Sequence, residues 1–442
     1  GTTGLTAGTG DITLLNTSNG FGGLVTASGN DINLFGANGL EVAITATGNS
    51  ALSSDDDLTV SGTTQNLTTT TTGTDSTTSF GATTVGGDLA VTSSGDVTQT
   101  AALSVTGTSA LSATGKSVTL DDAANDFTGA VSGTAASMDL RDANALTLGT
   151  VTTTGDLDLQ SAGALDLGTS TVGGNLLANS GNADITQAGA LSVTGTTGLT
   201  AGTGDITLLN ENNDFKGAVT ASGKDVKIRD ANALDATVTA TGVAQLQAGG
   251  TLSTVLAVTG NTNLTSGGNL TMSGNSADLI VNSGGTTSLG ETTLSGKLDL
   301  TSQESLTQTG KLVVGSTADI TSTDGDITLL NENNDFKGAV TVAGRNVSIA
   351  SLSNLTLAQA TVQSNFTVAS AGNLVFGPTN VGGNLSATTA GGSITQTGAI
   401  LVLGKATFDA GDGSIDLSNP DNYFPSGVDA KGSSIVITGD SN

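Results

Sequence analysis

The chain has 442 residues, of which 36% are hydrophobic but only 2% aromatic, and it contains 64 Gly, three Pro and no Cys or His. Its formal net charge is −27, because Asp is common while Lys and Arg together number only 12. The missing Cys and His exclude disulfide bonds, the usual zinc sites and nucleophiles activated by His. The few cations argue against binding to nucleic acid or anionic lipid, since both depend on Lys and Arg.

The apolar residues are mainly Leu, Val, Ile and Ala, which suit a narrow core. The sequence contains no run of about 18 apolar residues, so it predicts no membrane span. The first residues show no secretory signal, and Gly1 matches Gly195, a residue inside the array of repeats. We therefore expect the chain to be a piece of a longer repetitive protein, with any signal outside it.

Internal repeats organise the sequence. Residues 1–16 recur identically at 195–210, and residues 205–220 recur at 326–341. A longer unit is marked by a Phe nine residues after an Ile or Val, and its copies begin at Ile12, Val118, Ile206, Ile327 and Ile415. The copies are 106, 88, 121 and 88 residues apart. Unequal spacings around a constant motif indicate units built from different numbers of a smaller repeat.

The smaller repeat is followed through equivalent apolar positions, here called anchors. Within a unit the anchors are about 17–21 residues apart, whereas every unit opens with a 28-residue step. The anchors between the unit starts are Leu40, Leu58, Thr78 and Val97; Leu146, Leu165 and Ile185; Leu234, Leu252, Leu270, Thr287 and Leu306; and Leu355, Leu374 and Ile394.

Short alternating runs such as Leu157-Asp158-Leu159 predict strands, and Gly, Asn, Asp and Ser interrupt them about every six residues. Three short strands and three turns fit into about 20 residues, and such a coil buries its apolar edge only by stacking on the next coil. The sequence therefore predicts an all-β, right-handed parallel β-helix. We expect one continuous shaft over residues 1–442, with coils of about 17–21 residues and a 28-residue coil at the start of each unit.

The 28-residue step holds about eight extra residues around the Phe motif, for example residues 211–217. We interpret them as a wider coil or a bulging loop, with the Phe packed over an apolar patch rather than binding a ligand. Asn16, Asn210 and Asn331 precede the extra residues at one fixed position, which Asp122 shares. Asn in a recurring turn adopts a left-handed conformation or caps a backbone group.

Few residues suggest chemistry. Residues 114–117 (Thr-Gly-Lys-Ser) resemble the end of a phosphate-binding loop, but Ala110 stands where that motif needs Gly and a strand follows. Carboxylates at 55–57, at 121–122 and at Asp156 and Asp158 could serve as acid and base on a polysaccharide or hold calcium loosely, although exposed turn residues are the simpler interpretation. Threonine runs at 68–72 and 152–154 leave ice or mineral binding as a remote alternative.

The repeats resemble those of filamentous-haemagglutinin-type exoproteins, large bacterial proteins secreted by the two-partner (type Vb) route. The resemblance rests on the NDFxGAV stretches at 125–131, 213–219 and 334–340, on DANALTLG at 142–149 and on the GDITLLN coils, and it covers essentially the whole chain. It implies a β-helical shaft outside the cell, used in adhesion or biofilm formation, and an outer-membrane secretion partner. The motif is degraded at 18–24 and 421–427, so no adhesive role passes to a particular residue.

From these observations we expect a structural protein of a bacterial surface filament or adhesin and not an enzyme, with a carbohydrate-active β-helix as the alternative. No catalytic, cofactor-binding or metal-ligating residue is predicted, and loosely bound calcium is the one ligand left open. The expected partners are neighbouring coils of the same long chain or further copies stacked head to tail. Stacking is expected because an open solenoid end exposes unpaired backbone groups and apolar core.

Overall fold

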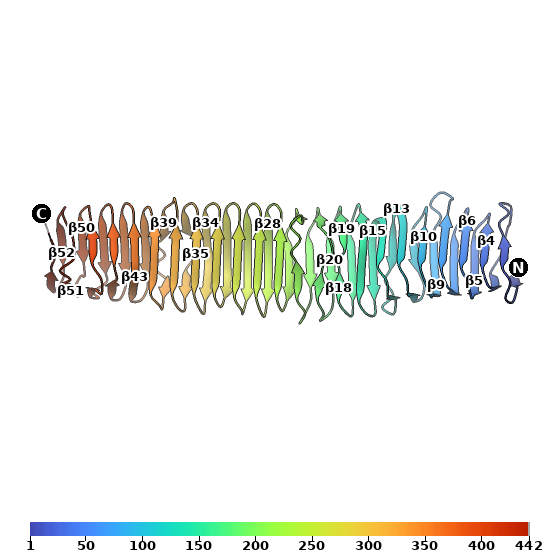
Figure 1. The fold of residues 1–442 in the computed structure, drawn as a ribbon, viewed down its shortest axis with the longest axis horizontal. Coiled ribbons are helices and arrows are strands. Elements are labelled where there is room, and N and C mark those ends of the chain that lie inside the picture. Colours follow the sequence, from blue (N-terminus) through green and yellow to red (C-terminus); the bar gives the residue numbers. More distant parts are fainter. Residues whose placement is uncertain (441–442) are drawn as a thin grey trace. The chain divides into compact units, whose positions relative to one another are not determined.

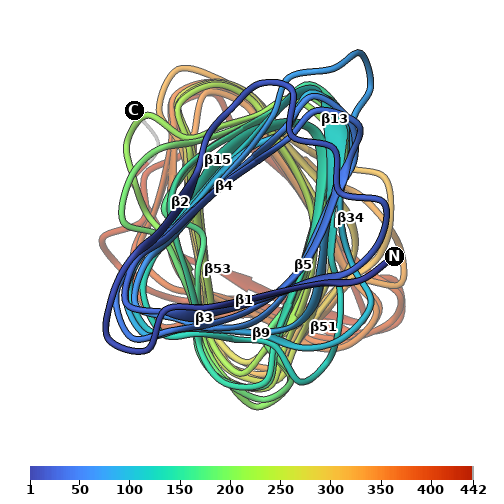
Figure 2. The ribbon, with the colours of Figure 1, turned by 90° about the vertical axis from the view of Figure 1, so that its right-hand side faces the viewer.

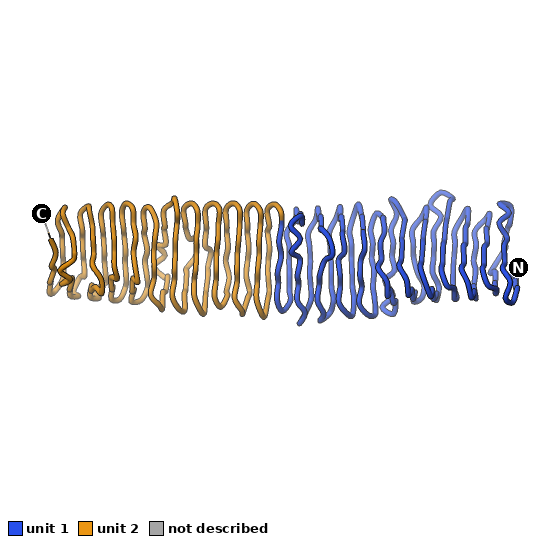
Figure 3. Tube along the Cα trace, in the orientation of Figure 1, with its two compact units in different colours: residues 1–230 blue, residues 231–442 orange. Residues whose placement is uncertain are grey.

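The computed structural model describes residues 1–440 and forms two compact units, Gly1–Asp230 and Ala231–Asn442 (Figure 3). Each unit is treated by itself. The single shaft over 1–442 stays a prediction, and its last two residues lie outside the described part of the chain. In the described residues, all regular secondary structure is β-strand (Figure 1). Each unit is an all-β parallel β-solenoid with coils of roughly 19 residues, as the sequence predicts. The right-handed sense of the coil stays a prediction.

The strands of unit 1 form three parallel ladders. Ladder 1 contains β2 (Ile12–Leu14), β4 (Ile32–Gly36), β6 (Ser50–Ser54), β8 (Leu67–Thr71), β10 (Leu89–Thr92), β19 (Thr169–Val172), β22 (Leu191–Val193) and β25 (Asp214–Phe215). Ladder 2 contains β11 (Val97–Gln99), β17 (Leu157–Ser161), β20 (Leu176–Asn179), β23 (Thr197–Thr200) and β26 (Val219–Gly223).

Ladder 3 of unit 1 has two runs, separated at the Phe127 motif. The first contains β1 (Thr3–Thr6), β3 (Val25–Gly29), β12 (Leu103–Val105) and β14 (Asp126–Phe127); the second contains β18 (Leu165–Asp166), β21 (Ile185–Thr186), β24 (Ile206–Leu208) and β27 (Val226–Asp230). Longer strands turn a corner and join two ladders: β5 (Leu40–Ala46), β7 (Leu58–Thr64), β9 (Thr78–Val85), β13 (Ser109–Leu120), β15 (Val131–Asp142) and β16 (Leu146–Thr153). Figure 2 looks along the stack and shows β1 and β3 on one side of the coil and β2 and β4 on another.

Unit 2 also has three parallel ladders. The first contains β36 (Leu306–Gln308), β39 (Ile327–Leu329), β42 (Val347–Ser351), β44 (Phe366–Ser370), β47 (Leu385–Thr389), β50 (Ala406–Asp409) and β52 (Val428–Lys431). The second contains β37 (Leu312–Val314), β40 (Asp335–Phe336), β45 (Leu374–Phe376), β48 (Ile394–Gln396), β51 (Ser414–Leu417) and β53 (Ser434–Ile437).

The third ladder of unit 2 contains β29 (Ala244–Ala248), β31 (Thr262–Ser266), β33 (Leu279–Ser283), β35 (Leu298–Ser302), β38 (Ala318–Ser322), β41 (Val340–Gly344), β46 (Thr379–Val381) and β49 (Ile400–Val402). The strands β28 (Leu234–Ala240), β30 (Leu252–Val258), β32 (Leu270–Ser276) and β34 (Thr287–Leu294) join the first two ladders, and β43 (Leu355–Val362) joins the second and third.

Alternation of side chains builds the interior. In β4, Ile32 and Leu34 are fully buried while Asn33 between them faces outward. Each fully buried Leu or Ile contributes about 1.5–3 kcal/mol relative to an exposed one. A few strands turn a corner through Gly: Gly62 in β7 has φ +110° and lies so close to the Ile44 carbonyl oxygen that an added Cβ would be 1.9 Å from it. Only Gly tolerates both the left-handed φ and this close approach.

The predicted anchors within each long unit lie directly above one another. Leu40 pairs with Leu58, Leu58 with Thr78, and Val97 with both Thr78 and Val118. The columns that begin at Leu146, Leu234 and Leu355 are equally continuous, up to Ile206, Ile327 and Ile415. The shorter steps between anchors are therefore confirmed as coils.

The predicted 28-residue coil is wrong. Ile12 pairs with Ile32, Val118 with Met138, and Ile327 with Val347, so the coil that starts at each motif has the ordinary length. The next anchor, such as Leu146 after Val118, starts a column on a different ladder. The 28-residue step from Val118 to Leu146 is therefore the sum of two parts. The first is one ordinary coil, from Val118 to Met138, and the second is the eight residues from Met138 to Leu146 on the next ladder. The error arose because similar apolar runs occur on all three faces.

Candidate functional site

The feature that recurs in every long unit is the Phe motif. Its last four copies bury both the Phe and an Asn seven positions after the unit start, whereas Asn19 and Phe21 of the first copy are only partly buried. The Asn side chains at 125, 213 and 334 are 0% exposed, and Asn422 is 1% exposed. In each copy a short loop replaces part of a strand, and this Asn ends the loop. A buried amide must find partners for both its oxygen and its nitrogen.

The partner is a Gln in the coil before, 26 residues earlier in the chain. Asn125 donates from Nδ2 to Gln99 Oε1 at 2.9 Å and accepts from Gln99 Nε2 at 2.8 Å. Asn125 Oδ1 also accepts the Leu103 backbone N–H at 2.8 Å, and Nδ2 donates to the Leu120 carbonyl at 3.0 Å. We call this arrangement the Asn–Gln clasp. It ties the loop to the coil below and satisfies backbone groups that the interrupted strand leaves open.

The clasp recurs with nearly the same geometry in the later copies. The side chain of Asn213 exchanges two hydrogen bonds with that of Gln187, at 2.8 and 2.9 Å. In unit 2 the pairs are Asn334 with Gln308 and Asn422 with Gln396, with all four distances 2.8 Å. A fixed network at a fixed position makes the clasp the most constant polar feature of the chain.

The motif loop also bears out two predictions. The Asn or Asp at its start caps the backbone: Asn210 Oδ1 accepts the N–H of Asn212 at 3.0 Å, and Asp122 Oδ1 accepts that of Ala124 at 2.9 Å. The Phe packs inward, since Phe127 and Phe215 are each 1% exposed.

A carboxylate completes the motif in unit 1. Asp142 Oδ2 accepts the Phe127 N–H at 2.7 Å, and Asp230 Oδ2 accepts the Phe215 N–H at the same distance. These Asp residues belong to the repeated RDANAL stretches. Burial raises the pKa of Asp142, while its bonds from the backbone N–H groups of Phe127 and Asn144 act in the opposite direction. In unit 2 the same position is Ser351, so the carboxylate is not essential to the motif.

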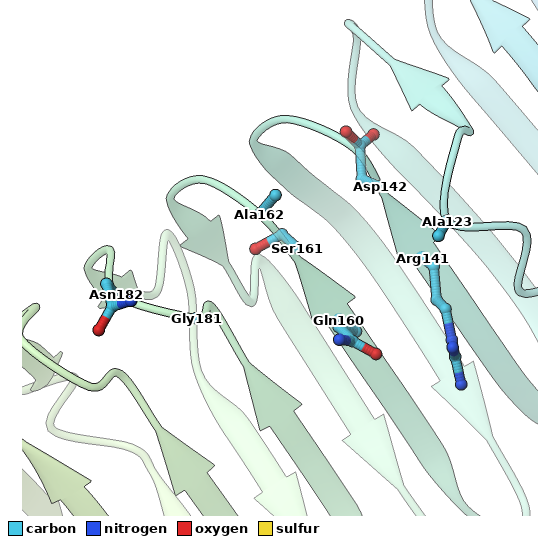
Figure 4. Close-up of a pocket in the computed structure, with 8 residues that line it drawn as sticks. All are labelled: Ala123, Arg141, Asp142, Gln160, Ser161, Ala162, Gly181 and Asn182. Atoms are coloured by element: carbon cyan, nitrogen blue, oxygen red, sulfur yellow. The ribbon is translucent and has the colours of Figure 1, made fainter.

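A groove of about 390 Å³ lies beside the second motif loop (Figure 4). Its lining includes Ala123 of the loop, Arg141 and Asp142 of β15, and Gln160 of β17. In Figure 4 the side chains of Arg141 and Gln160 point to the same side, away from the Asp142 carboxylate. The groove is open, and its lining is mixed, with apolar surface beside the charges of Arg141 and Asp142.

An equivalent groove of about 370 Å³ occurs in unit 2, beside the loop that carries Glu332. Most of its lining residues are at the same positions relative to the motif, but Ala350 and Ala369 stand where the first groove has Arg141 and Gln160. The backbone around the motif therefore repeats, and so do Ser161 and Ala162 as Ser370 and Ala371, while the Arg and Gln side chains of the first groove do not. The charged and amide groups that line the first groove have no counterpart at these positions of the second.

Three of the carboxylates singled out in the sequence, those of Asp55, Asp57 and Asp156, accept hydrogen bonds from the next coil. Asp57 Oδ1 accepts the N–H of Thr77 at 2.8 Å, Asp156 Oδ1 accepts that of Asn175 at 2.7 Å, and Asp55 accepts the Thr72 hydroxyl at 2.6 Å. The Asp88 carboxylate likewise accepts a hydrogen bond from the Thr108 backbone N–H. The bonds from the Thr108 N–H and hydroxyl lower the pKa of Asp88. Asp158 of β17 pairs with Asp139 of the neighbouring strand β15. Burial is the main cause that raises the Asp139 pKa, and the negative charge of Asp158 raises it further.

The remaining sequence candidates are also placed in the solenoid. Residues 114–117 lie within strand β13, where Lys116 pairs with Asp75, so no phosphate-binding turn forms there. The threonine runs alternate: Thr68 and Thr70 face outward from β8, whereas Thr69 and Thr71 are buried. Thr152 and Thr154 are likewise outward, with Thr153 between them buried.

The clasp was missed in the sequence, although a signal was present. Asn recurs seven residues after each unit start, and Gln99, Gln187, Gln308 and Gln396 each stand 26 residues before such an Asn. A search for polar residues at constant offsets from the Phe would have found both. Within residues 1–440 no group of three or more Asp and Glu is arranged to hold a metal ion. No helix in that part of the chain is long and apolar enough to cross a membrane.

The comparisons with known proteins define the family. No curated protein and no solved structure matches the chain. A model described as repeats of unknown function (DUF5649) matches residues 1–28, 64–134, 135–165, 155–222, 276–343 and 363–431, well over half of the chain. The matched segments contain all four clasp pairs and the motif at the start of the chain. The chain belongs to the DUF5649 family of repeats of unknown function, and its repeats form a β-solenoid.

Proposed function

We propose that the chain is a structural shaft of a bacterial extracellular or cell-surface filament, which gives length and rigidity to an adhesin or a biofilm matrix. The observation that carries the proposal is that the repeat preserves the interior and the clasp but not the outer grooves. The clasp keeps its distances in four copies, whereas the grooves change from Arg141 and Gln160 to Ala350 and Ala369. A repeated binding site would keep its outward chemistry, while a shaft needs only its stacking.

The resemblance of NDFxGAV and DANALTLG to filamentous-haemagglutinin-type repeats supports the finer proposal of a two-partner-secreted exoprotein. The outward charge is compatible with this role. Eight ion pairs in the described residues, such as Arg345 with Asp326, neutralise much of the small positive charge locally. The remaining negative charge opposes lateral association of shafts. Further copies or further coils of the same polypeptide are the proposed axial partners.

Two measurements test the proposal. Electron microscopy of the purified chain is expected to show stiff rods of uniform width, and antibodies raised against it are expected to label intact, unpermeabilised cells of the source organism. Flexible particles, or labelling only after lysis, would contradict the role. A polysaccharide-binding screen with a reducing-sugar assay is run in parallel. Release of reducing ends that survives repurification of the protein would favour the carbohydrate-active alternative instead.

A further inference from the structure

The same sequence occupies different faces of the solenoid in unit 1. Residues 1–16 and 195–210 are identical. In the first copy, β1 lies in ladder 3 and β2 in ladder 1, whereas in the second copy β23 lies in ladder 2 and β24 in ladder 3. An identical segment therefore folds into the same pair of strands on two different pairs of faces. The residues in the segment do not specify the face.

The motif moves around the coil in the same way. Ile12 lies in ladder 1, Val118 in ladder 2 and Ile206 in ladder 3, so the three motifs of unit 1 begin on three successive faces. In unit 2, Ile327 and Ile415 also begin on successive ladders. The clasp is unaffected by the face: the Leu103 N–H reaches Asn125 at 2.8 Å, and the Leu191 N–H reaches Asn213 at 2.9 Å.

We propose that the three faces are interchangeable, so that the number of long units sets the direction in which all following coils face. Insertion or removal of one unit would turn the following coils to the neighbouring ladder without loss of stacking. The physical reason is that all three ladders present similar inward columns, mainly of Leu, Ile, Val and Ala with an occasional buried Ser or Thr, such as Ser109, Thr78 and Thr83. Length and orientation are then coupled. The inference rests on the fold and does not depend on an extracellular role.

The test is a deletion of residues 118–205, one 88-residue unit, from the full chain. Ile206 would then take the place of Val118 above Val97, and Asn213 would reach Gln99 to rebuild the clasp. A control deletion of residues 146–164 removes one coil and leaves every following strand on its own ladder, because Leu165 stacks on Leu146. A second control removes residues 146–155, which would turn Leu157 outward.

The face is read by cross-linking, since the chain has no Cys of its own. Thr98→Cys with Thr207→Cys is expected to cross-link with a short thiol reagent in the 118–205 deletion but not in the full chain. Thr98→Cys with Thr119→Cys, the residues that follow the Val97–Val118 pair, is the positive control in the full chain.

Interchangeable faces predict that both the unit deletion and the one-coil deletion keep the β-sheet circular dichroism per residue. Their melting midpoints are expected to agree within a few degrees, whereas the ten-residue deletion loses signal. If the one-coil deletion folds and the unit deletion does not, the faces are distinct and the proposal is wrong. A folded unit deletion without the 98–207 cross-link would overturn it equally.

Discussion

At the scale of single residues, the polar groups that matter most are the buried amides of the clasp. Their partners are all within the protein, so the loss of one side chain leaves several groups without a bond. A buried donor or acceptor left unpaired costs about 1–3 kcal/mol, more than a typical hydrogen bond contributes. The clasp residues should therefore be more sensitive to substitution than the exposed Asp residues.

Asn125→Ala is expected to destabilise the coils around the second motif by about 1–3 kcal/mol for each unpaired group, because the Gln99 amide and the Leu103 N–H lose their acceptor. Native-state hydrogen exchange resolved along the chain measures the loss. The exposed Asn144→Ala is the matched control. Adding Gln99→Ala should recover part of the loss, and fully additive effects of the two substitutions would contradict a shared network.

Acid should weaken unit 2 at a defined ion pair. The bonds from Arg345 and Asn346 hold the Asp326 pKa down to about 2. Since this pKa lies below the ordinary 3.8, the carboxylate contributes stability above pH 4 that is lost as the pH falls from about 4 towards 2. Hydrogen exchange near residues 326–346, followed against pH, checks the prediction. Asp326→Asn should remove the pH dependence in this window, and an unchanged profile in that variant would assign the effect elsewhere.

The residue-level features differ in how far the sequence reveals them. Burial of Phe127 and capping by Asn210 could be predicted, because both follow from local chemistry at a recurring position. The pairing of Asn125 with Gln99 could not be reached in this way, since it joins residues in different coils and depends on the register. The register describes which residues of neighbouring coils pair, so it cannot be derived from the sequence of one coil alone.

At the scale of the coil, each strand contacts mainly the coil before and the coil after. Replacing a stacked interior residue should therefore cause local damage. Leu165 is fully buried between Leu146 and Ile185. The period of this column was predictable, because side-chain alternation and turn residues recur in every coil. The length of the coil that contains the motif could not be predicted, because Leu140 and Leu146 are equally apolar but belong to adjoining faces.

Leu165→Asp is expected to break strand pairing at its own coil, because it places an unpaired charge in an apolar column. Increased hydrogen exchange should extend one or two coils to either side and no further. The neighbouring Asp166→Asn, which changes only an outward charge, is the control. A uniform rise in exchange throughout unit 1 would show that the unit behaves as one cooperative block instead.

At the scale of the whole chain, the charge sets how molecules meet. The formal charge of −27 falls to zero near the sequence pI of about 4.1. We expect a solubility minimum there and lateral association of particles, both reversed at pH 7. Light scattering against pH checks this, with the β-sheet circular dichroism recorded at each step. Association accompanied by a helical signal, or clumping that is greatest at pH 7, would disagree with the charge argument.

The short, regular offset between paired residues has a consequence for how the chain acquires its structure. Ile12 pairs with Ile32, Ser50 with Leu67, and Val105 with Phe127, so a strand's partner always lies about one coil further along the chain. A nascent segment needs only that much further polypeptide before it can be incorporated. The chain can thus fold progressively from one end, with each completed coil serving as the template for the next. The apolar surface that each docking coil buries would hold that coil in place while the next one forms.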